Sequence, residues 1–400
     1  MNTVSKNGSL QNAVSTLTKQ FRANIQTYAI IVALIFIWIL FSMLTGGLYL
    51  SPQNFSNLFR QMTVTSFLAC GMVLVIVTGN IDLSVGKLAG FVSVVVAAFQ
   101  ANIWTRVFPG HEAMTTALSI LIGLGVGLLV GVLQGYVISY LSVPSFIVTL
   151  GVQWILNGGI LLVTQGKTIP ANQPQLSWVA QGYLLPIIGW IAAAGVVALL
   201  FYTMLSSRQK KRRYGFELAP LRTDIFKTTF YAILVVAYVA IVNFYNGVQI
   251  PVLLLAVTVV VMAYVSNNTR FGRYAYAIGG NREAARLSGV NINKNIFGIF
   301  VLMGFLCGVA GVVLASYVGY GTIAAGGGYE LDAIASCILG GTSTLGGEGT
   351  VFGMIIGSMI MASLTNGLQM LNVQAAWQYV VKGIVLIMAV YTDVYFKKNR

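Results

Sequence analysis

Charged residues are scarce in this chain of 400 residues: only 8% are Asp, Glu, Lys or Arg, whereas 57% are hydrophobic. A soluble globular domain carries about 25% charged residues, because its surface must face water. So few charges cannot cover a water-facing surface of this size, which excludes a soluble globular protein. The 44 glycines agree with this, since helices in membranes use glycine to approach one another closely. The composition therefore indicates an integral membrane protein.

Acidic residues are scarcer still, with nine against 23 Lys and Arg, and the formal net charge is +14. In a soluble protein such an excess would suggest a nucleic-acid ligand. Here the basic residues stand in loops and tails and not along one face with aromatic residues between them. We therefore interpret the excess as the positive charge that membrane proteins collect in their cytoplasmic segments, and we expect no nucleic-acid partner.

Residues that bind metals or perform catalysis are also few. The single histidine, His111, cannot form a metal site alone, and Cys70, Cys307 and Cys337 lie in apolar stretches without close spacing. The chain has no Gly-x-x-x-x-Gly-Lys-Ser/Thr loop for the phosphates of ATP; Gly86-Lys87-Leu88 comes nearest and lacks the leading glycine and the hydroxyl residue. We therefore expect no metal, no cofactor and no enzymatic activity in this chain.

Long apolar runs fill most of the sequence. A bilayer core takes roughly 20 helical residues, so these runs predict an all-α integral membrane protein, a polytopic bundle of about 12 transmembrane helices (10 to 12). Residues 27–395 form the predicted transmembrane domain, between cytoplasmic tails 1–26 and 396–400. The predicted spans are 28–48, 61–78, 87–102, 116–140, 145–164, 184–205, 228–243, 250–265, 296–318, 331–345, 351–368 and 377–395.

Basic residues indicate the orientation of these spans. The densest basic cluster, Arg208–Arg213, lies between the sixth and seventh spans, and a long charged connection covers 267–295. With a cytoplasmic N-terminus, the alternation of loops places both segments on the cytoplasmic side, as the positive-inside rule requires. The sequence therefore predicts that both termini lie in the cytoplasm.

Glycines recur every four residues in the fourth predicted span, at positions 123, 127, 131 and 135, and Gly353 and Gly357 repeat this spacing. Residues four apart lie on one face of a helix, and small residues there let a second helix approach closely. Either this spacing marks a helix contact, or it arises by chance in a glycine-rich chain.

Four charged residues lie near the ends of predicted spans: Asp82, Glu330, Asp332 and Lys382. Charges inside a membrane are costly and therefore suggest a function. A carrier coupled to protons or sodium is expected to place carboxylates nearer the midplane. For Asp82 and Asp332 two interpretations stay open, a helix cap on free backbone N–H groups or a direct place in a transport pathway.

Asp82 and Asp332 also occur in two short segments of similar sequence, 79–86 and 328–335, and each segment introduces a span. By the alternation of loops, the two segments lie on opposite sides of the membrane. This is the arrangement of an inverted repeat, in which one half of the chain runs through the membrane in the opposite sense.

The connection 267–295 contains a short stretch of good helix formers, Glu283 to Leu287. Asn281 precedes it as a helix start, and Gly289 follows it as a helix stop. Its charges predict an exposed helix on the cytoplasmic face. Such a helix is either a solvated loop or a docking element, in which case Ala284 and Ala285 would lie against a partner protein.

These motifs together resemble one family. Residues 281–289 resemble the coupling segment of binding-protein-dependent ABC importer permeases. Residues 81–86, 143–151, 329–335, 340–343 and 366–368 are similar to motifs of the ribose/xylose/galactose branch of that family. The extra helix pair between Arg208 and Asn246, which the ribose-type members lack, makes the chain most similar to the xylose-type members.

The resemblance implies a homodimer in the bacterial cell (inner) membrane, with an ATP-binding ABC subunit that uses ATP and Mg²⁺ and a periplasmic or tethered sugar-binding protein. The expected function is ATP-driven import of a monosaccharide, D-xylose or a similar sugar. Galactose, ribose, arabinose, branched-chain amino acids or a furanosyl signalling compound are the other substrates in view. The alternative function is a secondary carrier or channel for a small polar solute, which would transport without an ATPase.

The resemblance also implies functional residues. It assigns coupling to the ATPase to Asn281, Arg282, Glu283, Ala284, Ala285, Arg286, Leu287, Ser288 and Gly289. It does not assign contacts with the sugar. Candidates for the pathway or for helix caps are Asp82, Ser84, Gln134, Thr149, Glu330, Asp332, Asn366 and Gln378.

Overall fold

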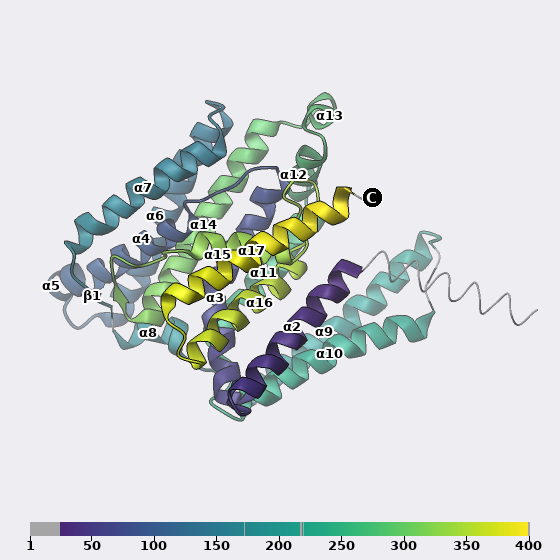
Figure 1. Ribbon diagram of the computed structural model, residues 1–400, viewed down its shortest axis with the longest axis horizontal. Helices are drawn as coiled ribbons and strands as arrows, with labels where there is room; N and C mark the ends of the chain where they lie inside the picture. The colour runs from purple at the N-terminus through teal and green to yellow at the C-terminus, as the bar shows by residue number, and fades with distance from the viewer. Residues whose placement is uncertain (1–24, 172, 217, 219, 399–400) are drawn as a thin grey trace, which may run out of the picture.

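The computed structural model describes residues 25–398 apart from 172, 217 and 219, and Figure 1 shows them as a bundle of helices. Its elements, in chain order, are α2 (Ile25–Leu44), η1 (Leu48–Leu50), α3 (Pro52–Val77), α4 (Val85–Ala98), η2 (Phe99–Trp104), α5 (Thr105–Val107), α6 (Glu112–Ser139), α7 (Ser145–Thr164), β1 (Ile169–Pro170), α8 (Pro174–Gln181), α9 (Pro186–Arg213), α10 (Leu221–Asn243), α11 (Ile250–Asn268), α12 (Arg270–Gly280), α13 (Arg282–Leu287), α14 (Ile292–Val318), β2 (Tyr320–Gly321), α15 (Tyr329–Leu339), α16 (Val351–Met370) and α17 (Ala375–Lys398).

The predicted all-α, polytopic membrane bundle is confirmed. Within the described residues, nine helices are long and apolar enough to cross a membrane. The helices α2 and α17 contribute shorter apolar stretches, Ile30–Leu44 and Ala375–Tyr391. The first described helix, α2, begins at Ile25, and the last, α17, ends at Lys398. The two helices therefore include the inner residues of both predicted tails. The remaining tail residues, 1–24 and 399–400, lie outside the described residues.

The predicted span 331–345 is wrong in its bounds. In its place, α15 has 11 residues and a length of about 16 Å, half of what a bilayer core requires. Residues 322–328, which precede α15, have no regular secondary structure. Gly326 and Gly328 in this segment have φ angles of 68° and 82°, in the left-handed region that favours glycine and ends a regular helix. This crossing of the bundle is therefore a broken one, half irregular and half helical.

Helix α14 lies at the centre of the bundle, and its side chains Phe300, Met303 and Cys307 are completely buried. The glycines of α6 bring that helix against it. A Cβ added at Gly131 would lie 2.7 Å from the carbonyl oxygen of Phe300, and one added at Gly127 would overlap the carbonyl oxygen of Gly304. The predicted role of the glycine spacing in helix packing is confirmed.

Contacts distinguish two ends of the bundle. At one, the α13 end, Gly279 at the end of α12 meets Val77 at the end of α3 and Gly347 in the loop after α15, and α13 follows α12. At the other, the β-ribbon end, β1 pairs with β2 in antiparallel register, Ile169 opposite Gly321. In Figure 1 the C-terminus lies at the α13 end.

Two segments run in opposite directions between these ends. The helix α3 ends at the α13 end and is followed by the irregular residues 78–84 and by α4. The helix α14 ends at the β-ribbon end and is followed by the broken crossing and by α15. The antiparallel relationship is the one that the short sequence repeat predicts.

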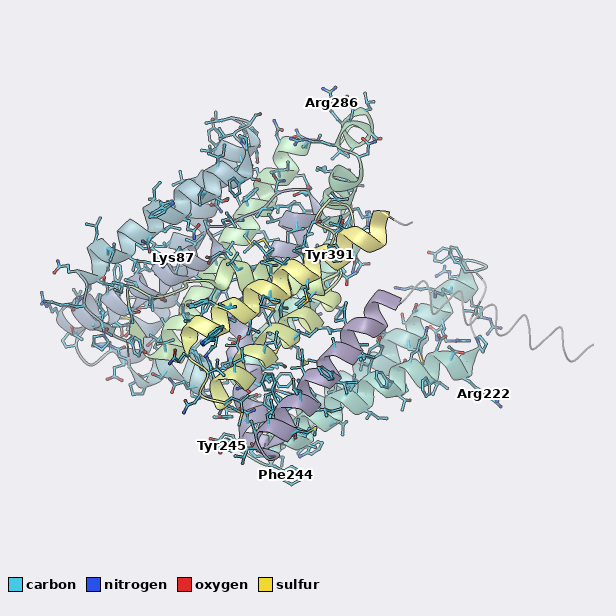
Figure 2. The ribbon with its side chains drawn as sticks, in the orientation of Figure 1. Lys87, Arg222, Phe244, Tyr245, Arg286 and Tyr391 are labelled. Atoms are coloured by element: carbon cyan, nitrogen blue, oxygen red, sulfur yellow. The ribbon has the colours of Figure 1, made fainter. Side chains whose placement is uncertain are left out.

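The helices α9 and α10 form a hairpin at the side of the bundle. Its small core, Ala193, Val239, Val242 and Val248, lies near the end where Leu184 bonds to Val248. Figure 2 shows Phe244 and Tyr245 at this end of the hairpin and Arg222 at the opposite end. Most of the hairpin's apolar side chains are exposed, as expected for helices that face lipid.

Candidate functional site

The predicted short helix exists as α13. The side chain of Asn281 accepts a hydrogen bond from the backbone N–H of Ala284 and so caps the helix. The helix ends at Leu287, and Gly289 follows with a φ of 81°. Figure 2 shows Arg286 at the tip of this segment, projecting beyond the rest of the bundle.

The surface of α13 is exposed except at one residue. Glu283 and Arg286 form an ion pair of 2.6 Å, and both side chains are about two thirds exposed. Leu287 is 78% exposed, which is unusual for a leucine on a helix whose other exposed side chains are mostly charged. Ala284 is exposed, whereas Ala285 is buried within the chain itself. The expectation that Ala285 lies against a partner is therefore wrong, because its own fold covers it.

The preceding helix α12 is fixed tightly at its C-terminal end. The backbone N–H of Gly347 donates a hydrogen bond of 2.8 Å to the carbonyl oxygen of Val77. Gly279 packs on the same two residues, and a Cβ added there would overlap Val77 and lie 2.6 Å from the nitrogen of Gly347. This junction of Val77, Gly279 and Gly347 joins α12, and through it the exposed α13, to the end of α3 and to the loop that follows the broken crossing.

The helices α4 and α15 begin next to each other. A Cβ added at Gly86, in the first turn of α4, would lie 2.6 Å from the carbonyl oxygen of Gly326 and 2.9 Å from the nitrogen of Glu330. Helix N-termini carry partial positive charge, so the carboxylate of Glu330 lies where two such charges favour it. Its Oε2 has no hydrogen-bond partner within the described residues. Lys87, labelled in Figure 2, follows Gly86 and supplies a nearby positive charge.

Four of the predicted candidates, Asp82, Ser84, Gln134 and Thr149, form one buried cluster around the irregular residues that precede α4. Asp82 accepts hydrogen bonds from the hydroxyl of Ser84 (2.6 Å) and from the amide of Gln134 (3.0 Å). Thr149 accepts one from the backbone N–H of Leu83 (3.2 Å). All four predicted side chains are completely or almost completely buried. The cluster fastens the irregular residues 78–84 to α6 and α7.

The capping interpretation fits Asp82 and does not fit Asp332. Asp82 accepts a hydrogen bond of 2.9 Å from the backbone N–H of Ser84, the residue that precedes α4. Asp332 lies inside the first turn of α15, and its carboxylate accepts a hydrogen bond of 2.8 Å from the ammonium group of Lys382 on α17. Because both side chains are at most one fifth exposed, this ion pair is partly withdrawn from water.

A cavity of ≈ 620 Å³ lies between α3, α15, α16 and α17, and the Asp332–Lys382 pair forms part of its wall. Its volume is within the range of about 300 to 1,000 Å³ that is usual for small-molecule sites. The other polar lining residues are Gln61, Thr65, Tyr317, Tyr329, Thr365, Gln369, Gln378 and Tyr379. Amides, hydroxyls and phenols of this kind can donate to and accept from the hydroxyl groups of a polar solute.

Of the predicted pathway candidates, Asp332 and Gln378 line this cavity. Gln378 also donates to the carbonyl oxygen of Val373 at 2.8 Å. Asn366 lies behind the wall, where it accepts a hydrogen bond from Asn54 (2.9 Å) and donates one to Gln61 (3.3 Å). Asp82, Ser84, Gln134 and Thr149 are elsewhere, in the buried cluster.

Most polar residues of the cavity were absent from the predicted set. A signal for four of them is present in the sequence, because Gln61 and Thr65, like Thr365 and Gln369, stand four residues apart in apolar helices. Such pairs place two polar side chains on one helix face. That the two faces meet depends on the packing of α3 and α16, which Gln61 and Gln369 join through a hydrogen bond of 2.8 Å.

Comparison with known proteins identifies the family. The family described as branched-chain amino acid transport system / permease component matches residues 54–390. The xylose transport system permease protein XylH of Haemophilus influenzae is 40% identical over 94% of this chain and 98% of its own length. The galactose/methyl galactoside import permease protein MglC of Escherichia coli is 33% identical over 86% and 87%.

The ribose import permease protein RbsC of Bacillus subtilis is 32% identical over 90% of both chains. No solved structure matches the chain. The matches cover both the junction at Gly279 and the cavity, and they confirm the resemblance to the ribose/xylose/galactose branch. This chain therefore belongs to the transport-system permease family, among its sugar permeases.

Proposed function

We propose that this chain is the transmembrane subunit of an ATP-driven importer that takes up D-xylose or a similar monosaccharide. The observation that carries the proposal is its 40% identity to a xylose permease over almost the full length of both chains. The cavity supports it, because its amide, hydroxyl and phenol groups suit a molecule that is covered with hydroxyls.

In this proposal α13 docks into an ATP-binding subunit, which binds ATP and Mg²⁺ and hydrolyses the nucleotide. This chain has no phosphate loop of its own. The exposed Leu287 is the apolar anchor of the docking surface, and the exposed Ala284 lets the partner approach closely. Movement of α13 is passed through the junction of Val77, Gly279 and Gly347 to α3 and the irregular residues 78–84 after it, and to the broken crossing that contains α15.

The chain further acts as a homodimer, with a sugar-binding protein docked at the β-ribbon end. It lies in the bacterial inner membrane with both termini in the cytoplasm, because Arg208–Arg213 and the charged helix α13 then face the cytoplasm. The Asp332–Lys382 pair and Gln378 contribute to the pathway for the sugar, whereas the cluster around Asp82 holds the irregular residues before α4 in place.

One observation favours a second substrate class. The family description names branched-chain amino acids, and the cavity wall offers the carboxylate of Asp332 and the ammonium group of Lys382. Opposite charges of this kind could bind the two charged groups of an amino acid. We place the sugar first because the two groups are 2.8 Å apart and satisfy each other.

A reconstituted system tests the proposal. Vesicles that contain this chain and its partner ATP-binding subunit are supplied with the partner sugar-binding protein, and uptake of labelled D-xylose, galactose, ribose and leucine is compared. We expect ATP-dependent uptake of a monosaccharide. Uptake of leucine in place of every sugar would favour the second candidate, and uptake without ATP would favour a carrier or channel.

A further inference from the structure

A basic pocket lies between α9 and α10, at the end of the hairpin that is remote from its small core. Its volume is ≈ 330 Å³. Arg208 and Lys211 from the last turns of α9 and Lys227 from α10 line it. The position is separate from the cavity, from the cluster around Asp82 and from α13, and no step of the proposed transport uses it.

The charges of the pocket are unbalanced. Arg208 forms an ion pair with Asp224 across the two helices, which fixes the guanidinium group in the wall. Asp224 is the one acidic side chain among the lining residues that the structure describes. Lys211 and Lys227 therefore add two positive charges that this carboxylate does not neutralise, and both lysines are exposed. The pocket has the charge of an anion site.

The surroundings of the pocket are apolar. Leu200, Met204 and Tyr231 form the wall that lies further along the helices, away from the basic tip. On the outer surface beside it, Tyr202 is 68% and Phe226 is 74% exposed. Exposed aromatic and aliphatic side chains on membrane helices face lipid, and aromatic residues collect where the bilayer meets water. One end of the pocket is thus basic and the other continues into a lipid-facing surface.

We propose that this pocket binds the headgroup of an anionic phospholipid. The phosphate lies between Lys211 and Lys227, and the acyl chains lie along the exposed apolar surface of the hairpin. Basic pockets between membrane helices near the cytoplasmic surface suit such headgroups. The lipid stabilises the end of the hairpin where helix packing is weakest, since the buried residues of its core lie at the opposite end.

Native mass spectrometry of the purified full-length chain in detergent tests this proposal. Phosphatidylglycerol and phosphatidylcholine with the same acyl chains are added in turn, and the bound fraction is measured. The pocket variant is Lys211→Gln with Lys227→Gln. The matched control is Arg212→Gln with Arg222→Gln, which removes the same charge from the hairpin end at residues that do not line the pocket. Figure 2 shows Arg222 at the outer tip.

The wild-type chain is expected to bind phosphatidylglycerol in preference to phosphatidylcholine. The pocket variant should weaken this binding roughly ten- to thirtyfold, whereas the control should change it less than threefold. Equal loss in both variants would mean general attraction by the basic tip and would overturn the proposal. So would displacement of the lipid by inorganic phosphate, or loss of ATPase co-purification in the pocket variant with its lipid preference unchanged.

This test needs neither sugar nor ATP, so its failure would leave the proposed transport function untouched. Unfolding temperatures of both variants that equal the wild-type value in lipid-free detergent confirm that both variants are folded. If phosphatidylglycerol then raises the unfolding temperature of the wild type and of the control only, the site and its stabilising role are both supported. A rise in the pocket variant equal to that of the wild type would contradict them.

Discussion

The backbone N–H of Gly347 and the carbonyl oxygen of Val77 are joined by a hydrogen bond of 2.8 Å. The bond links the loop after α15 to the last residue of α3, although 270 positions separate the two in the chain. Gly279 from α12 packs against both partners. Each of the three segments belongs to a different part of the proposed mechanism: the end of α3 leads to the irregular residues before α4, the loop with Gly347 follows the broken crossing, and α12 leads to α13. In the proposed mechanism a displacement of α12 therefore acts on the end of α3 and on the loop after α15 at once.

The junction predicts a sharp difference between two neighbouring glycines. A methyl group at Gly279 would overlap the backbone of Val77, whereas one at Gly280 would meet nothing within 4 Å. We expect Gly279→Ala to reduce ATP-dependent uptake at least tenfold, because the backbones must separate to admit it, and Gly280→Ala to retain it. Uptake by equally expressed variants provides the measurement. Equal activity of the two variants would remove the junction from the mechanism.

The exposed Leu287 should act through its apolar surface. With 78% of its side chain exposed, Leu287→Asp costs little in folding, since surface substitutions usually change stability by less than 0.5 kcal/mol. We expect it to abolish co-purification with the ATP-binding subunit and Leu287→Met to retain it. If the aspartate variant co-purifies normally, then α13 does not dock through this residue.

Gly289 tests whether the shape of the end of α13 matters. Its φ is 81°, which a residue with a Cβ resists by roughly 1 kcal/mol or more, while the space around it is open. Gly289→Val should therefore alter the backbone locally and reduce uptake without loss of membrane insertion. Asn293→Ala, at an exposed residue outside the segment 281–289, serves as the control and should stay near wild type. A valine variant with normal uptake would indicate a solvated loop.

The Asp332–Lys382 pair predicts non-additive effects. Lys382→Met alone leaves a carboxylate that is only 12% exposed without its partner, and should lower the free energy of unfolding by about 2 to 3 kcal/mol. The double variant with Asp332→Asn should lose less than the single one. Thermal unfolding of the four proteins in detergent provides the double-mutant cycle. Additive losses would mean that the two side chains do not interact in the folded protein.

Orientation in the membrane is tested by cysteine labelling. The native thiols of Cys70, Cys307 and Cys337 are buried, so an impermeant reagent should not reach them and an introduced cysteine can be labelled selectively. A cysteine at Lys167, beyond the end of α7, should react with an impermeant reagent from outside the cell. One at Gln209, near the basic end of α9, should react only after the membrane is opened. Labelling of the Gln209 variant from outside would contradict the proposed topology.

Much of the fold could be predicted from the sequence, because apolar length alone identifies membrane helices. The cap at Asn281 and the stop at Gly289 were also predictable, since both depend on residues within one turn. The bounds of α15 were not. The predicted span extends to Leu345, whereas α15 ends at Leu339, where Gly340 packs against Gly353 of α16 and Gly341 has a φ of 86°.

The functional site was less accessible from the sequence for a related reason. The sequence predicts Asp82, Ser84, Gln134 and Thr149 as separate candidates, and the structure joins them in one buried cluster. The cavity instead uses Gln61, Thr365 and other residues whose helices lie far apart in the chain. Which polar faces meet is decided by tertiary packing, for which a single sequence carries no local signal.

The central claim is that this chain moves a monosaccharide only when a partner ATPase drives it. The most direct measurement is uptake of labelled D-xylose into vesicles that hold the chain with its ATP-binding subunit, with sugar-binding protein outside and ATP inside. We predict uptake against a gradient that stops without ATP or without either partner. Equilibration of the sugar by vesicles that contain this chain alone would contradict the claim and indicate a carrier or channel.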